Sequence, residues 1–194
     1  MKVVIIKYNA GNIFSVTSAL KRIGVEAVIT DDKNIISSAD KVIFPGVGEA
    51  GTTMRYLKAK NLDFFIKNLK QPVLGICLGM QLMCKKSEEG NVECLGIFDE
   101  DVQKFPAGSL KIPHMGWNNI TKVKEPLFNK TLENEYVYFV HSYYVSLGTD
   151  TIASAEYILP FSAALNKNNF YATQFHPEKS GDAGERILKN FIYL

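Results

Sequence analysis

The sequence predicts an α/β fold: an open, mostly parallel β-sheet with flanking helices and an added antiparallel β region. In the first part of the chain, apolar β-branched runs alternate with helical patterns, as they do in βαβ units. Toward the middle, repeated Gly and Pro residues interrupt these patterns, and the apolar runs that follow are short. Such runs favour antiparallel strands. We see no internal repeat and no linker that would divide the chain.

The N-terminal segment contains the first predicted βαβ unit. Val3–Ile6 is a β-branched run and is predicted to be a buried strand. A turn over residues 8–12 follows, in which Asn12 can cap a helix over about residues 13–23. Gly24 ends that helix at the position where a left-handed residue is common, and residues 25–29 form the second predicted strand.

The later elements continue this pattern as far as residue 89 and then change. Residues 40–44 lead into a third strand, and residues 53–61 and 62–69 are predicted helices. The apolar run after Pro72 predicts a fourth strand, followed by a helix whose charged, exposed end reaches Glu89. Beyond it we expect short antiparallel pieces such as residues 117–123, then strands over residues 136–140, 152–157, 162–165 and 170–175. A closing helix is predicted over residues 182–194, with its core face formed by Ile187, Leu188, Phe191 and Ile192.

Composition limits the classes of function. The 194 residues favour one domain, and the 22 basic and 20 acidic residues nearly balance, so nothing indicates binding to nucleic acid or to a membrane surface. We find no signal peptide and no apolar segment long enough to span a membrane. The three cysteines are an odd number, which argues against a disulfide framework and for the cytoplasm. They lack C-x-x-C spacing and nearby histidines, so we expect no metal site.

Cys77 is the candidate nucleophile. It stands between a predicted strand and a predicted helix, with Gly75 and Gly79 two residues away on either side. This is the Gly-x-nucleophile-x-Gly pattern of a nucleophile elbow. Side chains at the glycine positions would collide at so sharp a turn, and the N-terminus of the helix favours a thiolate. The alternative is that Cys77 is a small buried hydrophobe that only packs, which is the commoner role of a cysteine.

The segment 45–48, Pro-Gly-Val-Gly, follows the third predicted strand. Its glycines permit backbone conformations that other residues resist, so a peptide flip is easy there. Either the segment is an ordinary strand-to-helix turn, or it directs N–H groups toward a developing oxyanion. It comes too late in the chain for a dinucleotide-binding loop, and G-x-G-x-x-G is absent from the first turn, so we expect no nucleotide cofactor.

His176 is the candidate base among the three histidines of the chain. It follows the last predicted strand, and Glu178 can orient its ring if the turn brings the carboxylate back. Imidazole can take a proton from a thiol and later return one to a leaving amine. Because loops after parallel strands share one edge of a sheet, segment 45–48, Cys77 and His176 can meet there. The alternative for His176 is a surface turn.

Together these motifs resemble the class I (triad) glutamine amidotransferases. The resemblance is carried by Gly75-Ile76-Cys77-Leu78-Gly79-Met80-Gln81 together with His176-Pro177-Glu178. Further segments narrow it to the glutaminase subunits of imidazole glycerol phosphate synthase, the HisH family: residues 45–48, 113–118 and 140–143, and the Lys179-Ser180 extension. The resemblance spans the chain from Tyr8 to the last helix. It implies a flavodoxin-like sheet in a single glutamine amidotransferase domain over residues 1–194.

The resemblance implies a reaction and a set of roles. The activity is release of ammonia from glutamine, without a cofactor, through a γ-glutamyl thioester on the nucleophile. The implied catalytic residues are Cys77, His176 and Glu178. The implied oxyanion hole consists of backbone N–H groups at Val47, Gly48 and Leu78. The residues implied to bind glutamine are Gly46, Gln81, Ser142 and Tyr143.

The resemblance also implies a partner. Ammonia would pass, shielded from water, to a (β/α)₈ cyclase subunit of the HisF type, in a heterodimer that serves histidine biosynthesis. The implied interface residues are Asn12, Trp117, Tyr138 and Lys179. From composition alone, core packing is the default role of Trp117, the only tryptophan. As an exposed interface anchor it would instead bind the cyclase.

The first turn departs from the family. The usual pattern is Asp-Tyr-Gly-x-Gly-Asn, whereas this chain has Lys7-Tyr8-Asn9-Ala10-Gly11-Asn12, which reverses a charge near the expected interface. The triad is unaffected. Two alternatives therefore stay open: a glutamine amidotransferase subunit of a different synthase, and a non-catalytic α/β binding module in which Cys77 only packs.

Overall fold

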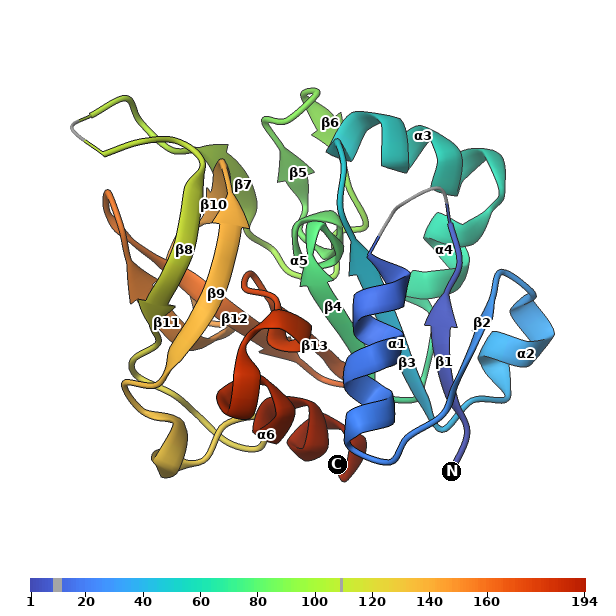
Figure 1. Ribbon diagram of the computed structural model, residues 1–194. Coiled ribbons are helices and arrows are strands. Elements are labelled where there is room, and N and C mark those ends of the chain that lie inside the picture. The colour runs from blue at the N-terminus through green and yellow to red at the C-terminus, as the bar shows by residue number, and fades with distance from the viewer. Residues whose placement is uncertain (9–11, 109) are drawn as a thin grey trace.

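A seven-stranded sheet in the order β11-β12-β13-β4-β3-β1-β2 runs through the molecule (Figure 1), within residues 1–8, 12–108 and 110–194, which are those the computed structural model describes. Its strands are β1 (Val3–Ile6), β2 (Ala27–Thr30), β3 (Lys41–Gly46), β4 (Val73–Cys77), β11 (Thr151–Glu156), β12 (Pro160–Lys167) and β13 (Phe170–Thr173). Asn9, Ala10 and Gly11 of the predicted first turn lie outside the described residues.

The parallel part of the sheet confirms the predicted fold class. β2, β1, β3, β4 and β13 are neighbours in that order and pair in parallel, which is the flavodoxin-like order. β12 and β11 extend the sheet by antiparallel pairing beyond β13. The loops that follow the parallel strands therefore open at one edge of the sheet.

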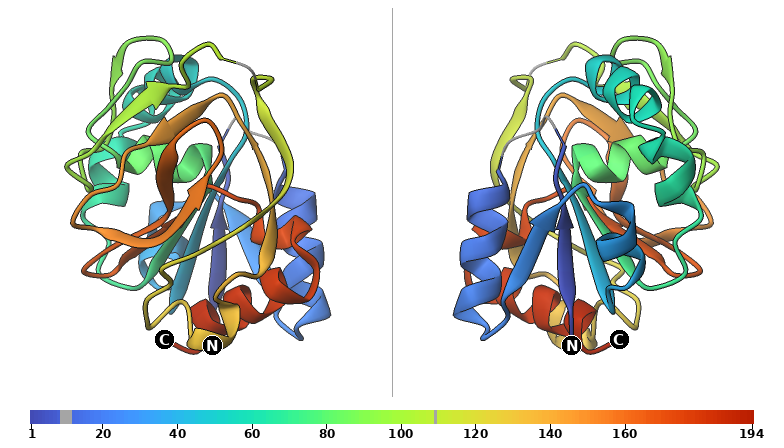
Figure 2. Two further views of the ribbon diagram at one scale, coloured as in Figure 1. Left: turned by 90° about the vertical axis from the view of Figure 1, so that its left-hand side faces the viewer. Right: turned by 90° about the vertical axis from the view of Figure 1, so that its right-hand side faces the viewer.

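Helices cover both faces of this sheet (Figure 2). On one face lie α1 (Ile13–Arg22) and α6 (Gly181–Ile192), and on the other lie α2 (Lys33–Ser37), α3 (Ala50–Ala59) and α4 (Leu62–Lys67). Successive side chains of a strand point to opposite faces. Val3 and Ile5 accordingly pack in the core beneath α1 and α6, whereas Val4 and Ile6 pack in the core beneath α2 and α3.

In the part of the chain that the structure describes, two smaller sheets form the antiparallel region. β8 (His114–Asn119) pairs with β9 (Tyr136–His141). The other sheet, in the order β10-β7-β5-β6, consists of β5 (Lys86–Ser87), β6 (Val92–Glu93), β7 (Asp101–Lys104) and β10 (Tyr143–Val145). The backbone N–H of His176 donates to the carbonyl of Tyr138 at 2.9 Å, which ties β9 to the turn after β13. The predicted antiparallel region is confirmed apart from β5 and β7, which pair in parallel, and β8 begins and ends earlier than the predicted piece at residues 117–123.

The helix predicted between Cys77 and Glu89 is wrong in its extent. α5 (Leu78–Met83) stops early, and the chain then enters β5. The N–H of Lys85 donates to the carbonyl of Glu100 at 2.9 Å, and the carbonyl of Lys85 accepts from the N–H of Cys94 at 2.9 Å. These pairings satisfy backbone groups that a longer helix would have bonded internally. The charged run at residues 85–89 therefore belongs to a strand and a turn.

The helix start at Asn12 is predicted correctly, but the capping role is wrong. α1 begins at Ile13, and Asn12 has a φ of 76° and makes no side-chain hydrogen bond to the helix. Its side-chain amide instead donates to Oε1 of Glu178, far along the sequence. Gly24, with a φ of 78°, follows the end of α1 as expected.

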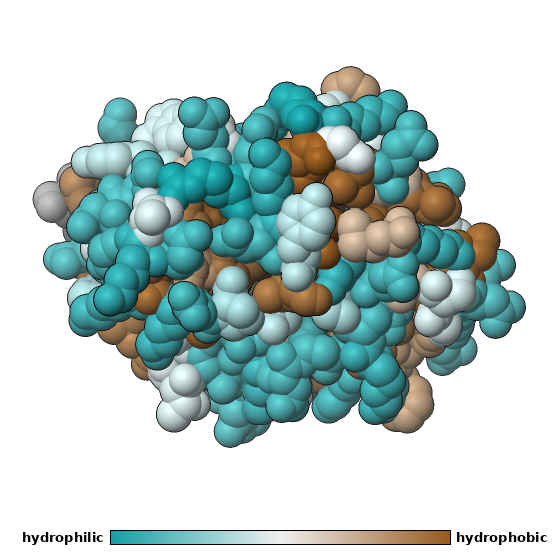
Figure 3. Space-filling model, turned by 90° about the horizontal axis from the view of Figure 1, so that it is seen from below, coloured by the Kyte–Doolittle hydropathy of each residue, from teal (hydrophilic) through white to brown (hydrophobic). Residues whose placement is uncertain are grey.

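The end of the sheet that carries both chain termini is covered mainly by hydrophilic side chains, with apolar ones scattered among them (Figure 3). None of the helices in the described part of the chain combines the length and the hydropathy needed to cross a membrane. The predicted site residues gather at the opposite end, where β3, β4 and β13 finish.

Gly184 allows α6 to pack against the short helix η2 (Pro177–Lys179), which carries Glu178. A Cβ atom at position 184 would lie 1.9 Å from the carbonyl oxygen of Pro177. Alanine favours a helix over glycine by about 1 kcal/mol, but such a clash costs more, so we expect Gly184→Ala to destabilise the protein by about 2 kcal/mol. Chemical unfolding measures this change. Gly108→Ala is the matched control, since nothing lies within 4 Å of a Cβ there; equal losses in both variants would contradict this packing.

Candidate active site

Cys77 occupies the junction between β4 and α5. Its backbone has a φ of 53° and a ψ of −108°, a strained conformation that costs a residue with a side chain about 1–3 kcal/mol. Its pairing with Gly46 of β3 holds the strand side of the junction, and the first turn of α5 holds the other. The structure therefore contains the sharp strand-to-helix turn that the sequence predicts.

Two glycines let α5 approach the sheet closely. A Cβ atom on Gly79 would lie 2.0 Å from the carbonyl oxygen of Phe44, on β3. A Cβ atom on Gly75 would lie 2.9 Å from Sδ of Met83 and 3.0 Å from the backbone of Gly79. Gly79 therefore has no room for a side chain, whereas at Gly75 a Cβ atom would be crowded by the backbone and side chain of α5.

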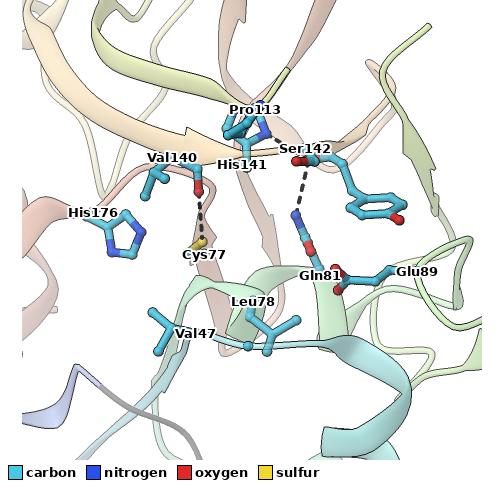
Figure 4. Close-up of a pocket in the computed structure, with 12 residues that line it drawn as sticks. Val47, Cys77, Leu78, Gln81, Glu89, Pro113, Val140, His141, Ser142 and His176 are labelled. Carbon is cyan, nitrogen blue, oxygen red and sulfur yellow. Dashed lines mark hydrogen bonds between the residues drawn. The ribbon is translucent and has the colours of Figure 1, made fainter. Parts of the chain in front are cut away.

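His176 and Glu178 lie where β13 gives way to η2. Nδ1 of His176 is 2.8 Å from Oε1 of Glu178, and the two side chains are 1% and 0% exposed. Because an ionised carboxylate only accepts hydrogen bonds, Nδ1 carries the proton. Nε2 has no hydrogen-bond partner among the described residues, and the ring faces the Cys77 sulfur (Figure 4). Ser180 holds the turn, since its hydroxyl donates to the carbonyl of His176 at 2.6 Å.

The surroundings of His176 decide its charge. Burial by itself lowers the pKa of the ring, but the Cys77 side chain and the Glu178 carboxylate favour the charged form more strongly and raise the pKa from 6.5 to about 10. The Asn12 amide donates to Oε1 of Glu178, the same carboxylate oxygen that faces the ring. A charged imidazole beside a sulfur is the arrangement in which a cysteine becomes reactive.

A cavity of about 330 Å³ opens beside Cys77 (Figure 4). The predicted site residues that line it are Val47, Gly48, Cys77, Leu78, Gln81, Ser142, Tyr143 and His176. Gly46 is not part of its wall and lies at the end of β3, where a Cβ atom would be 2.8 Å from Cβ of Leu78. The loops after β3, β4 and β13 therefore do converge at one edge of the sheet.

The loop at residues 45–48 is held at both ends. The hydroxyl of Tyr8 donates to the carbonyl of Pro45, and burial raises the pKa of Tyr8 well above its usual value, so it remains a donor. After Gly48, which has a φ of 124°, the carboxylate of Glu49 caps α3. The segment is a strand-to-helix turn and also a wall of the cavity, so the two interpretations of it are compatible.

No sequence motif marks Glu89 or Gln174, two polar residues near the nucleophile, as site residues. Glu89 lines the cavity, and its Oε2 accepts from the N–H of Ala50 at 2.9 Å. Burial raises the pKa of this carboxylate. The sequence hides Glu89 in a charged run that predicts an exposed helix end. Gln174 is fully buried near Cys77. The sequence feature that could identify it as a site residue is its position two residues before His176.

The other two cysteines are packed away from the cavity. Burial raises the pKa of Cys84 well above its usual value and that of Cys94 to about 12. Both therefore remain thiols, which are poor nucleophiles. Within residues 1–8, 12–108 and 110–194, no group of three or more His, Cys, Asp or Glu side chains could hold a metal ion.

Trp117, Tyr138 and Lys179 form one cluster on the surface. Trp117 and Tyr138 are paired across β8 and β9, with ring centroids 6.0 Å apart in an edge-to-face arrangement. Nζ of Lys179 lies 6.0 Å from the centre of the Tyr138 ring. Trp117 is 55% exposed, so core packing, its default role from composition, is wrong. Asn12 bonds to the buried carboxylate of Glu178, the residue before Lys179 in the chain.

The chain is similar to known proteins over its whole length. Residues 4–194 match the family model described as glutamine amidotransferase class-I. A protein of Bacteroides fragilis named imidazole glycerol phosphate synthase subunit HisH is 66% identical over 196 residues, covering 100% of both chains. A protein of the same name from Vibrio parahaemolyticus is 44% identical over 200 residues, covering 100% of this chain and 98% of its own.

Solved structures show the same fold at low sequence identity. A glutamine amidotransferase structure has a TM-score of 0.74 at 18% identity and covers 98% of this chain and 97% of that one. Another glutamine amidotransferase, from Thermotoga maritima, has a TM-score of 0.66 at 16% identity and covers 100% of this chain and 83% of its own.

The three histidines test the electrostatics of the site directly. Burial lowers the pKa of His114 to about 4 and that of His141 to about 3, whereas that of His176 is raised to about 10. An NMR titration of the folded protein between about pH 5 and 9 should therefore contain no histidine midpoint, although each histidine of the unfolded chain titrates near about 6.5. Cys77→Ala should lower the His176 midpoint, because it removes a group that favours the charged ring. A midpoint near 6.5 for His176 in the folded parent protein would refute this account.

Proposed function

This chain belongs to the class-I glutamine amidotransferase family, among the HisH subunits of imidazole glycerol phosphate synthase, and we propose that it hydrolyses glutamine to glutamate and ammonia. One arrangement carries the proposal: Cys77 on a strained turn faces the His176 ring, which Glu178 orients, at the wall of a cavity. A cysteine that only packs needs none of these features. We treat residues 1–194 as a single glutamine amidotransferase domain.

The reaction has two halves. In the first, His176 is charged and holds at Nε2 the proton taken from Cys77, and the thiolate of Cys77 attacks the side-chain amide carbon of glutamine. Backbone N–H groups at Val47, Gly48 and Leu78 hold the resulting oxyanion. His176 returns the proton to the amide nitrogen, so that ammonia leaves and a γ-glutamyl thioester remains. In the second half, a water molecule gives a proton to His176 and attacks the thioester carbon. The C–S bond then breaks, which releases glutamate and restores the Cys77 thiolate beside the charged His176.

Glutamine would lie between the nucleophile and Glu89. The Glu89 carboxylate is on the side of the cavity away from His176 (Figure 4), where it offers a negative charge to the α-ammonium group of the substrate. The other proposed contacts are Gly46, Gln81, Ser142 and Tyr143. Nε2 of Gln81 is engaged with the Tyr143 carbonyl at 3.1 Å and with Oε1 of Gln174 at 2.9 Å. Gln81 therefore shapes this wall of the cavity as well as contacting the substrate.

The ammonia would be consumed by a (β/α)₈ cyclase subunit of the HisF type, bound as a heterodimer in the cytoplasm for histidine biosynthesis. The relatives named HisH are subunits of a synthase, which supports a multi-subunit enzyme. The cluster of Trp117, Tyr138 and Lys179 offers an exposed aromatic anchor and a positive charge for that interface. Asn12 lies at the same interface in this proposal.

The two alternatives have less support. A subunit for a different synthase is disfavoured by the 66% identity to a HisH protein over the full length of both chains. Lys7, one of the two positions at which the first turn departs from the family pattern, is exposed. If the protein were a non-catalytic binding module, nothing would explain why His176 and Glu178 are buried together. The His176 ring also faces Cys77, which is the only thiol among the described residues that line the cavity.

Cys77→Ala tests the division of labour. In the complex with the cyclase, it should lower glutamine-dependent synthesis by more than about 10³-fold, because thioester formation needs the sulfur. Synthesis from added ammonium should continue, since ammonium bypasses the thioester. Cys94→Ala is the matched control, because that thiol lies outside the cavity wall. Loss of the ammonium-dependent reaction in Cys77→Ala would contradict the proposal.

Glu89→Gln tests the recognition of glutamine. If the carboxylate pairs with the α-ammonium group, its loss should raise KM for glutamine about tenfold to a hundredfold, the effect of losing a hydrogen bond to a charged group. The kcat should change much less, since the contact is present before and during the reaction. Glu88→Gln, at the exposed neighbour, should leave KM unchanged. An unaltered KM in Glu89→Gln would refute this contact.

A further inference from the structure

Gln174 is a buried side chain in contact with the nucleophile, and the mechanism above does not use it. It follows β13 directly and is 0% exposed, and its backbone N–H donates to the carbonyl of Ala163 at 2.8 Å. Nε2 of its side chain lies 3.8 Å from Sγ of Cys77. On another side, the carbonyl oxygen of Val140 lies 3.9 Å from the same sulfur. The sulfur thus lies between a nitrogen donor and a carbonyl acceptor.

The orientation of the Gln174 amide is determined by its neighbours. Gln81, which is 4% exposed, donates through Nε2 to Oε1 of Gln174 at 2.9 Å and to the carbonyl of Tyr143 at 3.1 Å. The Tyr143 carbonyl can only accept, so the Gln81 nitrogen must face it. The Gln81 nitrogen also needs an acceptor on Gln174, so Oε1 of Gln174 faces Gln81. The NH₂ group of Gln174 therefore faces Cys77. A flipped Gln174 amide would oppose two donors in a buried place, which is costly.

A pair of histidines holds the Tyr143 carbonyl from the other side. Nδ1 of His141 lies 2.7 Å from this carbonyl oxygen, and Nε2 of His141 lies 3.0 Å from Nδ1 of His114. Burial lowers the pKa of both rings, so both are neutral. His141 must then carry its proton on Nδ1, and His114 must donate to the bare Nε2 of His141. The chain of donors ends at Asn118, whose Nδ2 lies 3.5 Å from Nε2 of His114.

We propose that Gln174 donates a hydrogen bond that holds the Cys77 sulfur in place and stabilises its thiolate, with Gln81 and the Tyr143 carbonyl orienting the Gln174 amide. The inference rests on the proposed function, in which Cys77 is the nucleophile. An N–H donor stabilises a thiolate more than a thiol. It therefore increases the fraction of thiolate while lowering the nucleophilicity of each thiolate. Gln174 touches the reacting sulfur, whereas Gln81 acts through Gln174 and is a positioning residue.

Alkylation of Cys77 by iodoacetamide, followed by mass spectrometry from about pH 6 to 10, tests the proposal. Gln174→Met removes the donor and keeps an unbranched side chain. A hydrogen bond to a charged group contributes about tenfold, so the midpoint of the pH–rate profile should rise by about one unit. The rate at the alkaline plateau should rise about threefold, because a more basic thiolate is the better nucleophile. Gln81→Met should shift the midpoint in the same direction by less.

Gln71→Met is the matched control, because its amide donates to the carbonyl of Ile36 at 2.8 Å, at the opposite end of β4. It should leave the profile unchanged, and His176, Glu178 and Tyr8, the titratable groups around the sulfur, are retained in every variant. If thermal unfolding shows that Gln174→Met does not fold, Gln174→Leu replaces it, since it also lacks the donor and adds no charge beside the sulfur.

A midpoint and plateau equal to those of the parent in the folded Gln174 variant would overturn the proposal. Because local unfolding would also expose Cys77 to the reagent, the comparison is made between variants whose thermal unfolding matches that of the parent protein. Alkylation requires neither glutamine nor a partner, so this result is separate from the glutaminase assay. Failure of iodoacetamide to label Cys77 in the parent protein would instead count against the proposed function.

Discussion

The close contact between α5 and β3 is the constraint on which the site depends. The backbone of Gly79 lies so near the carbonyl of Phe44 that a Cβ atom there would be 2.0 Å from its oxygen. At this distance α5 begins directly at the edge of the sheet, and Cys77 must take a φ of 53° to join strand and helix. The same contact places Leu78 beside the end of β3 and the loop that follows it. The nucleophile and the loop proposed to hold the oxyanion are therefore positioned by one packing interaction.

Neighbouring groups decide the charge of each histidine ring, because all of the histidines in the described residues are buried. His176 is opposite a carboxylate and a sulfur, which outweigh its desolvation and favour an imidazolium. His114 lies against aromatic rings, with its ring centroid 4.0 Å from that of Tyr157 and 4.9 Å from that of Phe139. His141 likewise lies against Phe161 at 5.2 Å. Without an opposite charge these two rings stay neutral, and they serve as hydrogen-bonding links.

Strand β9 connects the surface cluster to the nucleophile. Along it, Tyr138 and Val140 share one face, whereas Val137, Phe139 and His141 are buried on the other. Tyr138 contacts Trp117 and Lys179 at the surface, and two residues later the carbonyl of Val140 reaches the Cys77 sulfur. The next residue, His141, holds the Tyr143 carbonyl. A partner bound at the cluster would therefore rest on the same strand that forms the wall above the sulfur.

The sequence by itself determined the fold class, the elbow and which residues are candidates for the triad, because a local pattern marks each of them, whereas only folding brings Cys77 and His176 together. A β-branched run predicts a strand, and Gly-x-Cys-x-Gly predicts a sharp turn, whatever the rest of the chain does. Tertiary structure alone decided where α5 ends, since the backbone of residues 85–94 pairs with distant strands. It also moved the Asn12 side chain from its own helix to Glu178. Glu89 and Gln174 became site residues only because folding brings them to the cavity and to the sulfur. Such roles depend on contacts between residues far apart in the chain, and no local pattern encodes those contacts.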